Sequence, residues 1–215
     1  MSSRRGRAAL GMCALALAGS LAGCSASDEP GTGRSARCRD PAVWSRDVAQ
    51  VVAQARAYLD QRLDRGVPAP AIVLDVDDTS LLTHPLTSSP DPDEAETAAA
   101  QARLPAIGPT RDLARHAAQR GVGVFFVTAR ADDPGLRHAT LVNLRGQGYP
   151  DPAGLVMRPA ADHGSSVERY KSGARADVER QGYRVLESLG DQYSDLDGGH
   201  AERGFKIPDP ACPTP

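Results

Sequence analysis

Acidic side chains cluster immediately after two short apolar runs of the chain. They are Asp75 and Asp77, which follow residues 71–74, and Asp191 and Asp195, which follow residues 183–189. Short apolar runs bounded by turn-forming residues predict buried strands. Because parallel strands end at the same edge of a sheet, where ligands bind, we expect these four carboxylates to meet there.

A threonine and a lysine are placed to join this group. Thr128 follows the apolar segment 122–127, and Lys171 lies on a predicted helix over 165–181. A lone threonine at a strand end is more often a cap, and a lone helical lysine is more often solvated. Their order in the chain relative to Asp75 makes both residues candidates for the same site.

The residue types at this edge indicate phosphoryl transfer. Crowded carboxylates are costly unless a cation neutralises them, and oxygen donors without Cys or His favour Mg²⁺ over zinc. A carboxylate–Mg²⁺–lysine cluster suits an incoming phosphate, because the cations offset the charge on its equatorial oxygens. Asp75 can then attack phosphorus. Asp77 can protonate the leaving oxygen and later activate water.

Alternating apolar runs and amphipathic segments define the elements that position these residues. Strands are predicted over 71–74, 122–127, 154–157 and 183–189, and helices over 40–66, 108–121, 134–146 and 165–181. Strand–helix alternation with short connections is typical of a doubly wound, mostly parallel sheet. We therefore expect a three-layer α/β/α sandwich. The Pro-rich segment from Thr83 to Gly108 is expected to form an extended rim and no folded lid, a minimal cap that leaves the site open.

The motifs resemble a known family. The order DxDxT, Thr, Lys and GDxxxD is similar to the signature of the haloacid dehalogenase (HAD) superfamily. The segments IVLDVDDTSL, FFVTAR, ERYKSGAR, LGDQYSDL and FKIPDP resemble its subfamily IIIB, which holds class C bacterial and plant vegetative-storage-protein-like acid phosphatases. The resemblance runs from about Val48 to Pro210 and implies a magnesium-dependent phosphatase acting on small phosphate monoesters.

The resemblance also implies a role for each matched residue. Asp75 would be the nucleophile and a metal ligand, and Asp77 the general acid/base that also ligates metal through its main-chain carbonyl. Thr128 and Lys171 would hold and stabilise the phosphoryl group. Asp191 and Asp195 would complete the metal site. From its place in the last motif, Tyr193 is the aromatic residue expected to flank the substrate.

The chain departs from the family pattern at three positions. Asp78 stands where the family usually has Glu, Ala129 where it has Gly, and Asp209 where it has Asn. None of these changes removes a catalytic group, so they bear on substrate preference more than on activity.

Other interpretations of the motifs remain open at this stage. The acidic segment after Leu74 could be a calcium loop, but Ser80 and Leu86 stand where an EF-hand needs Gly and Glu. A storage or binding protein could keep the fold without turnover, yet Asp75 is present. A phosphotransferase would use the same residues.

The N-terminal residues 1–23 have the features of a signal peptide. Arg4, Arg5 and Arg7 precede an apolar stretch that ends in Leu-Ala-Gly-Cys24, which resembles a bacterial lipobox. We therefore expect export, lipidation of Cys24 and attachment to the membrane through that anchor. Residues 24–38 are predicted to form a flexible tether, and residues 39–215 to form the phosphatase domain.

Cysteine usage and charge agree with an exported domain. Cys38 and Cys212 lie near the two ends of the mature chain and are predicted to form a disulfide, which would persist outside the cytoplasm. The net charge of −2 gives no basis for nucleic-acid binding. The sequence points to no particular oligomeric state.

Overall fold

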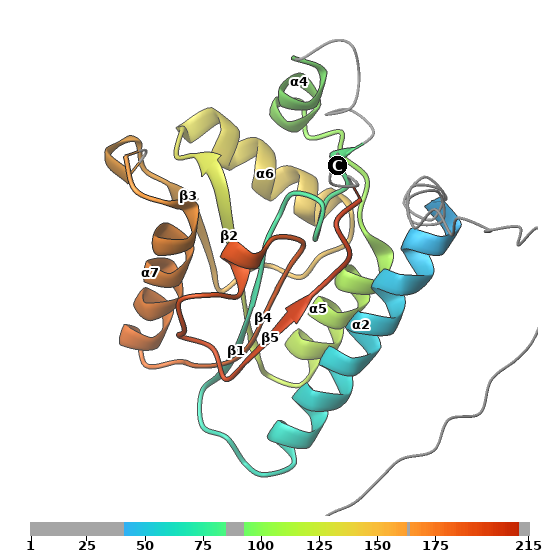
Figure 1. Ribbon diagram of the computed structural model, residues 1–215, viewed down its shortest axis with the longest axis vertical. Helices are drawn as coiled ribbons and strands as arrows, with labels where there is room; N and C mark the ends of the chain where they lie inside the picture. Colours follow the sequence, from blue (N-terminus) through green and yellow to red (C-terminus); the bar gives the residue numbers. More distant parts are fainter. Residues whose placement is uncertain (1–40, 85–92, 163, 211–215) are drawn as a thin grey trace, which may run out of the picture.

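A five-stranded parallel sheet forms the centre of the domain (Figure 1). The computed structural model describes residues 41–84, 93–162 and 164–210. The strand order is β3-β2-β1-β4-β5, and every neighbouring pair is parallel. The strands are β1 (Pro70–Leu74), β2 (Gly123–Ala131), β3 (Gly154–Arg158), β4 (Arg184–Gly190) and β5 (Arg203–Lys206).

Strand β1 is central because its side chains are apolar on both faces. Ile72 and Leu74 belong to the core on one side of the sheet, and Ala71 and Val73 to the core on the other. A continuous apolar run is what a strand buried on both faces requires. Asp75 directly follows this strand, so the fold places it at the middle of the carboxyl edge.

Helices cover both faces of the sheet, which confirms the predicted three-layer sandwich. One face carries α2 (Pro41–Leu63), α5 (Gly108–Gln119) and α6 (Pro134–Gly146), and the other carries α7 (Val167–Arg180). Figure 1 shows α2 and α5 side by side, with α7 on the opposite side of the strands. The buried residues of α2 recur at helical spacing: Val48, Val52, Ala55 and Leu59.

Local capping fixes where the lysine-bearing helix starts. The Ser166 side chain accepts a hydrogen bond from the backbone N–H of Arg169 at 3.2 Å, which satisfies an otherwise unpaired donor of the first turn. One turn later, Tyr170 and Lys171 are both buried. The cap therefore sets the phase in which α7 presents Lys171 to the sheet edge.

The prediction of an extended rim over residues 83–108 is wrong for residues 94–100. Helix α4 (Glu94–Ala100) forms there and packs against α6. Its alanines Ala98 and Ala99 are buried, because small side chains allow close helix–helix approach. Beyond the helix, the Asn143 side chain bonds to the backbone N–H and C=O of Leu104 at 2.9 and 2.7 Å.

The edge strand β5 was not predicted from the sequence. Within this short strand only Phe205 is buried, so the run lacks the apolar character of the other strands. Pairing with β4 nevertheless extends from Arg203 to Lys206.

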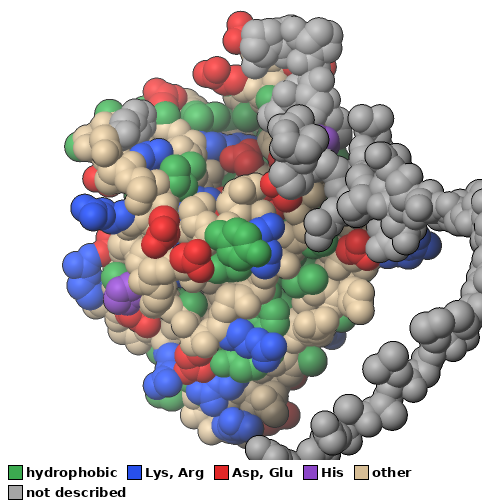
Figure 2. Space-filling model, in the orientation of Figure 1, with side chains coloured by type: hydrophobic (Ala, Val, Ile, Leu, Met, Phe, Trp, Pro, Cys, Tyr) green, Lys and Arg blue, Asp and Glu red, His purple; other side chains and the backbone are tan. Residues whose placement is uncertain are grey.

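Several predictions fall on residues outside the described ranges. They are the signal peptide (1–23), lipidation of Cys24, the tether (24–38) and the Cys38–Cys212 disulfide. Among residues 41–84, 93–162 and 164–210, no helix is long and apolar enough to cross a membrane. The face in Figure 2 intersperses acidic and basic side chains, in line with the small net charge.

Candidate active site

Three acidic residues from two strand ends form a compact buried cluster. Asp75 follows β1, Asp191 follows β4, and Asp195 lies on the 3₁₀ turn η2 (Tyr193–Asp195). Each offers a carboxylate oxygen within 4.8 Å of the others, and all three side chains are buried. The predicted convergence of these residues at one sheet edge is therefore observed, because β1 and β4 are neighbours in the sheet.

Lys171 supplies a positive charge to this cluster. Its Nζ donates to Asp75 Oδ1 at 2.6 Å and also contacts Asp195 Oδ1. Burial lowers the pKa of Lys171, but the carboxylates of Asp75 and Asp195 outweigh that effect and raise it above its ordinary value. Lys171 therefore stays charged within the site.

One lysine does not balance three buried carboxylates. Burial, with the added charge of Asp195, raises the pKa of Asp75 well above its ordinary value, although Lys171 opposes the shift. Burial also raises the pKa of Asp191 to about 6, against a hydrogen bond from Gln192. A cluster of oxygen donors that carries excess negative charge in a desolvated place fits a hard divalent cation.

The loop after β1 is built to hold Asp75. Ser80 Oγ donates to the Asp75 carbonyl at 2.6 Å. Asp78 adopts a left-handed conformation (φ 54°), and its Oδ1 accepts from the backbone N–H groups of Thr83 and His84. A non-glycine residue at positive φ is costly, and these two bonds offset the cost. Asp78, where the family usually has Glu, is thus a structural residue of the loop.

Thr79 links the two acidic loops. Its hydroxyl accepts from the backbone N–H of Asp191 at 3.0 Å and donates to Asp191 Oδ1 at 3.2 Å. Thr79 is fully buried, so the bond is shielded from water. The threonine of the DxDxT motif therefore fixes the orientation of a carboxylate on another strand.

Hydrogen bonds from Arg175 and Ser188 hold the backbone of Asp195, and its side chain packs directly against Gly190. Arg175 Nη1 donates to the Asp195 carbonyl at 2.6 Å, and Ser188 Oγ donates to the same oxygen at 2.7 Å. A Cβ atom on Gly190 would lie 2.0 Å from Asp195 Oδ2, which excludes any side chain there. Gly190 is the glycine of the GDxxxD motif and Arg175 ends the segment ERYKSGAR, but the sequence predicted no role for either residue.

Asp77 lies apart from the three clustered side chains. Its carboxylate accepts from Thr128 Oγ1 at 3.3 Å and from Arg130 Nη2 at 2.7 Å. Thr128 was predicted to follow a strand over 122–127, and this prediction is wrong. Strand β2 continues to Ala131, so Thr128 lies within it. Of the predicted site residues, Asp75, Asp191, Asp195 and Lys171 therefore form one cluster, whereas the side chains of Asp77 and Thr128 bond to each other next to it.

Comparison of the sequence with models of known protein families identifies the family of this chain. The family described as HAD superfamily, subfamily IIIB (acid phosphatase), matches residues 36–214. The chain belongs to subfamily IIIB. The resemblance noted from the motifs is therefore confirmed.

Two plant proteins illustrate the similarity within subfamily IIIB. Acid phosphatase 1 of Solanum lycopersicum is 32% identical over 146 residues, which cover 64% of this chain and 56% of that protein. The stem 31 kDa glycoprotein of Glycine max is 36% identical over 97 residues, 44% of this chain and 32% of that protein. The matched segments thus span little more than half of the tomato protein and about a third of the soybean protein.

A solved structure agrees with the subfamily IIIB fold. The class C acid phosphatase from Bacillus anthracis superposes with a TM-score of 0.62 at 21% identity, covering 74% of this chain and 67% of that one. The same enzyme with tungstate bound gives a TM-score of 0.61 at 22% identity, covering 74% and 68%. At this identity the likeness supports the fold.

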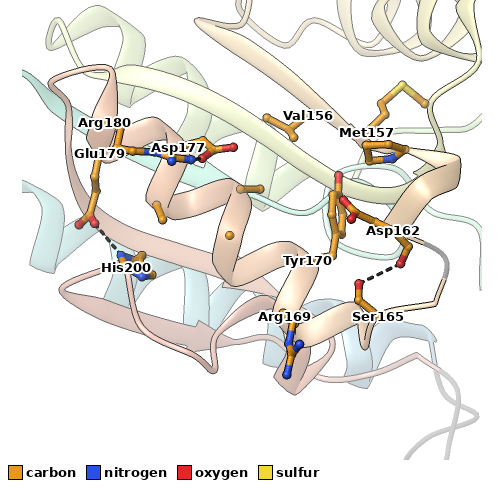
Figure 3. Close-up of a pocket in the computed structure, with 14 residues that line it drawn as sticks. Val156, Met157, Asp162, Ser165, Arg169, Tyr170, Asp177, Glu179, Arg180 and His200 are labelled. Atoms are coloured by element: carbon orange, nitrogen blue, oxygen red, sulfur yellow. Dashed lines mark hydrogen bonds and ion pairs between the residues drawn. The ribbon is translucent and has the colours of Figure 1, made fainter.

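Tyr193 and a groove along α7 lie outside the cluster of Asp75, Asp191 and Asp195. Tyr193 is 68% exposed, and Lys206 Nζ lies 5.5 Å from its ring centroid. A groove of about 740 Å³ runs along α7 toward β3 (Figure 3). It is lined by Met157, Tyr170 and His200, among others, and by none of the clustered acids. The groove is therefore separate from the candidate site.

Proposed function

We propose that the protein is an acid phosphatase that hydrolyses phosphate monoesters through a phospho-aspartate on Asp75. The observation that carries this proposal is the buried Asp75 carboxylate held 2.6 Å from Lys171 Nζ, with Asp191 and Asp195 beside it. Membership of subfamily IIIB and the similarity to a tomato acid phosphatase support it.

In the first half-reaction, an Asp75 oxygen attacks the phosphorus atom of the bound ester. The bond between phosphorus and the ester oxygen breaks, and Asp77 transfers a proton to the departing alcohol. Lys171 and the Thr128 hydroxyl stabilise the charge on the transferring group. Lys171 is suited to this task because burial keeps its charge unscreened by water.

In the second half-reaction, water attacks phosphorus and the bond to Asp75 breaks. Asp77 takes the proton from that water, so the same carboxyl returns to its starting state. Inorganic phosphate leaves, and Asp75 is free for another cycle. Both steps require Asp77 to lie beside the reacting phosphoryl group and outside the metal-binding trio.

Asp75, Asp191 and Asp195 would hold the divalent cation, for which we propose Mg²⁺. The main-chain carbonyl of Asp77 is a further proposed ligand. When bound, the ion would neutralise charge on the phosphoryl oxygens and on the clustered carboxylates. The donor set is all oxygen and includes three buried acids, which suits Mg²⁺ better than zinc.

The substrates we propose are small-molecule phosphate monoesters of varied structure. The exposed ring of Tyr193, beside Lys206, is proposed to flank the alcohol portion of the ester. A storage role without turnover is a weaker candidate, although a vegetative storage protein of Arabidopsis thaliana is 33% identical over 76 residues. The reason is that this chain keeps Asp75, whose loss would be the simplest route to inactivity.

Phosphate release by the purified domain tests the proposal. Release from a panel of monoesters should require a divalent cation and stop in excess chelator. Adding an alcohol acceptor separates hydrolysis from phosphotransfer, since transfer yields a new ester in place of phosphate. Full activity in excess chelator would contradict the mechanism.

We also propose that the protein is exported and anchored by a lipid on Cys24, with a Cys38–Cys212 disulfide. The sequence around Cys24 supports the anchor. A disulfide closing so long a loop would stabilise the fold by a few kcal/mol. Mass spectrometry of the exported protein tests the disulfide, and two free thiols would refute it.

A further inference from the structure

Arg130, near the end of β2, donates hydrogen bonds to both carboxylate oxygens of Asp77. Its Nε lies 3.2 Å from Asp77 Oδ1 and 3.0 Å from Oδ2, and its Nη2 lies 2.7 Å from Oδ1. The arginine side chain is 7% exposed, whereas that of Asp77 is 38% exposed. A two-pronged arginine–carboxylate contact fixes direction as well as distance. A partly exposed carboxylate is thus held by a buried partner.

The guanidinium is itself anchored to the fold. Arg130 Nη1 donates to Thr140 Oγ1 on α6 at 2.9 Å, and Thr140 is fully buried. The backbone N–H of Arg130 donates to Thr128 Oγ1 at 3.2 Å, and the same hydroxyl contacts Asp77. Each of the three guanidinium nitrogens has an acceptor within the protein. Two of the three nitrogens bond to Asp77, so the arrangement orients that carboxylate, while Nη1 and Nη2 each keep one further N–H group.

We propose that Arg130 is a positioning residue, which orients the Asp77 carboxyl for proton transfer to and from the reacting oxygen. This role rests on the proposed function, because only a phosphoryl-transfer reaction gives Asp77 a proton to move. In the first half-reaction the O–P bond breaks as the proton passes from Asp77 to the departing alcohol. In the second half-reaction Asp77 receives a proton from the attacking water.

Leaving-group chemistry separates this role from phosphate binding. An alkyl alcohol is a poor leaving group and needs the proton from Asp77, whereas nitrophenolate leaves without it. Loss of orientation should therefore reduce turnover of alkyl phosphates far more than that of 4-nitrophenyl phosphate. A residue that binds the phosphoryl group would affect all esters about equally, since every substrate carries that group.

The test compares Arg130→Ala, Arg130→Lys, Asp77→Asn and the double variant Arg130→Ala/Asp77→Asn across esters of increasing leaving-group basicity. Misplacement of a reacting group by about 1 Å can cost on the order of 100-fold, so we expect that loss of kcat/KM on alkyl phosphates. Loss on 4-nitrophenyl phosphate should be small. Arg130→Lys should not rescue, because lysine lacks the fork. The double variant should be no worse than Asp77→Asn alone.

Two further variants guard against a folding artefact. Thr140→Val removes the anchor of Arg130 without touching Asp77 and should give a smaller loss with the same leaving-group trend. Arg145→Ala removes a comparable arginine from an exposed pair with Asp151, and it should leave all rates unchanged.

The outcomes distinguish the two proposals. Equal losses on every ester, additivity with Asp77→Asn and weaker inhibition by inorganic phosphate would show that Arg130 binds substrate, which overturns its positioning role and leaves the phosphatase intact. A wild-type protein that releases no phosphate with any divalent cation would overturn the proposed function and, with it, the role of Arg130.

Discussion

Lys171 Nζ lies 2.6 Å from Asp75 Oδ1, and both side chains are almost completely buried. The pair joins helix α7 to the end of strand β1 across the carboxyl edge of the sheet. Burial of a carboxylate is costly unless a charge partner compensates for it. The site thus keeps Asp75, the proposed nucleophile, desolvated at a cost in stability.

The substitution Asp75→Asn tests separately the stability cost of burying this carboxylate and its proposed role in catalysis. Asparagine cannot form a phospho-enzyme, so activity should fall by several orders of magnitude. Thermal stability should hold or rise, because the substitution removes one charge from a buried acidic cluster. The measurements are phosphate release and the melting temperature. Asp151→Asn, at an exposed surface pair, should change neither.

A trapped intermediate identifies the attacking residue. Mass spectrometry should find phosphate on a peptide containing Asp75 in the wild type and none in Asp75→Asn. A label on another residue, or normal turnover by the variant, would show that Asp75 is not the nucleophile.

Metal binding should stabilise the folded protein independently of turnover. A ligand at a hundredfold excess over its dissociation constant adds about 2.7 kcal/mol to the free energy of unfolding. Mg²⁺ should therefore raise the melting temperature, and Asp191→Asn should weaken that response while raising the Mg²⁺ concentration needed for activity. Asp112→Asn, on a surface pair with Arg111, is the control. An equal Mg²⁺ response in all three proteins would place the cation elsewhere.

Glu187 predicts an unusual dependence of stability on pH. This residue of β4 is 0% exposed, and neither carboxylate oxygen has a hydrogen-bond partner among the described residues. Burial raises the pKa of Glu187 to about 8; Arg203 opposes this shift, and Asp60 adds to it. The folded state therefore holds a proton that the unfolded chain releases near pH 4.5. Stability is full below that pH and falls as pH rises toward 8.

Glu187→Gln should flatten this part of the pH profile. A shift of this size corresponds to at most roughly 5 kcal/mol in the free energy of unfolding. The wild type should lose up to this amount between pH 4.5 and 8, and the variant should not. Urea unfolding at a series of pH values measures the difference. Glu202 provides the opposite case: the hydrogen bond from Arg62 lowers its pKa to about 2, so Glu202 stabilises the fold above about pH 4.5 and this contribution is lost as the pH falls toward 2. Glu202→Gln should therefore lower stability at neutral pH and leave it unchanged below pH 2. Parallel wild-type and Glu187→Gln profiles would contradict the assignment.

The burial of Glu187 could not be predicted from the sequence. The apolar runs that became β1 to β4 were predictable, because each is bounded by turn residues and continuous enough to be buried. A single glutamate inside 183–189 gave no sign that it would be buried without a partner. Strand β5 and helix α4 were missed for the opposite reason: their sequences are polar or alanine-rich, and only tertiary contacts bury Phe205 and Ala98.

The candidate site divides in the same way. Asp75, Asp191 and Asp195 were predicted to meet because each follows a strand of a parallel sheet, and all such strands end at the same edge. The sequence did not predict the strand order that makes β1 and β4 neighbours. The pairing of Asp77 with Arg130 depends on the path of β2 beyond Thr128, where its register with β3 shifts. No spacing in the sequence encodes that shift.

Cys24→Ala tests the proposed anchor. Without the thiol, no lipid can be attached, so the protein should move from the membrane fraction to the medium or accumulate as an uncleaved precursor. The change is measured by the partitioning of the protein between detergent and aqueous phases. Cys13→Ala, within the signal segment, is the matched control and should leave the distribution unaltered. Detergent partitioning that is the same in both variants would refute lipidation at Cys24.

Gly190 offers a test of how tightly the acidic loop is built. A Cβ at this position would lie 2.0 Å from Asp195 Oδ2 and 2.1 Å from Asp195 Cβ, too close for the loop to keep its place. Gly190→Ala should therefore displace Asp195 from Lys171, lower the melting temperature, and weaken both Mg²⁺ stabilisation and phosphate release. Gly173→Ala is the matched control, since a Cβ there meets nothing within 4 Å and the position lies inside helix α7. That control should gain roughly 0.5–1 kcal/mol, because alanine loses less backbone entropy than glycine on forming a helix. A Gly190→Ala protein with wild-type melting and wild-type Mg²⁺ response would show that η2 can shift without cost, and that Asp195 does not depend on close packing to reach the site.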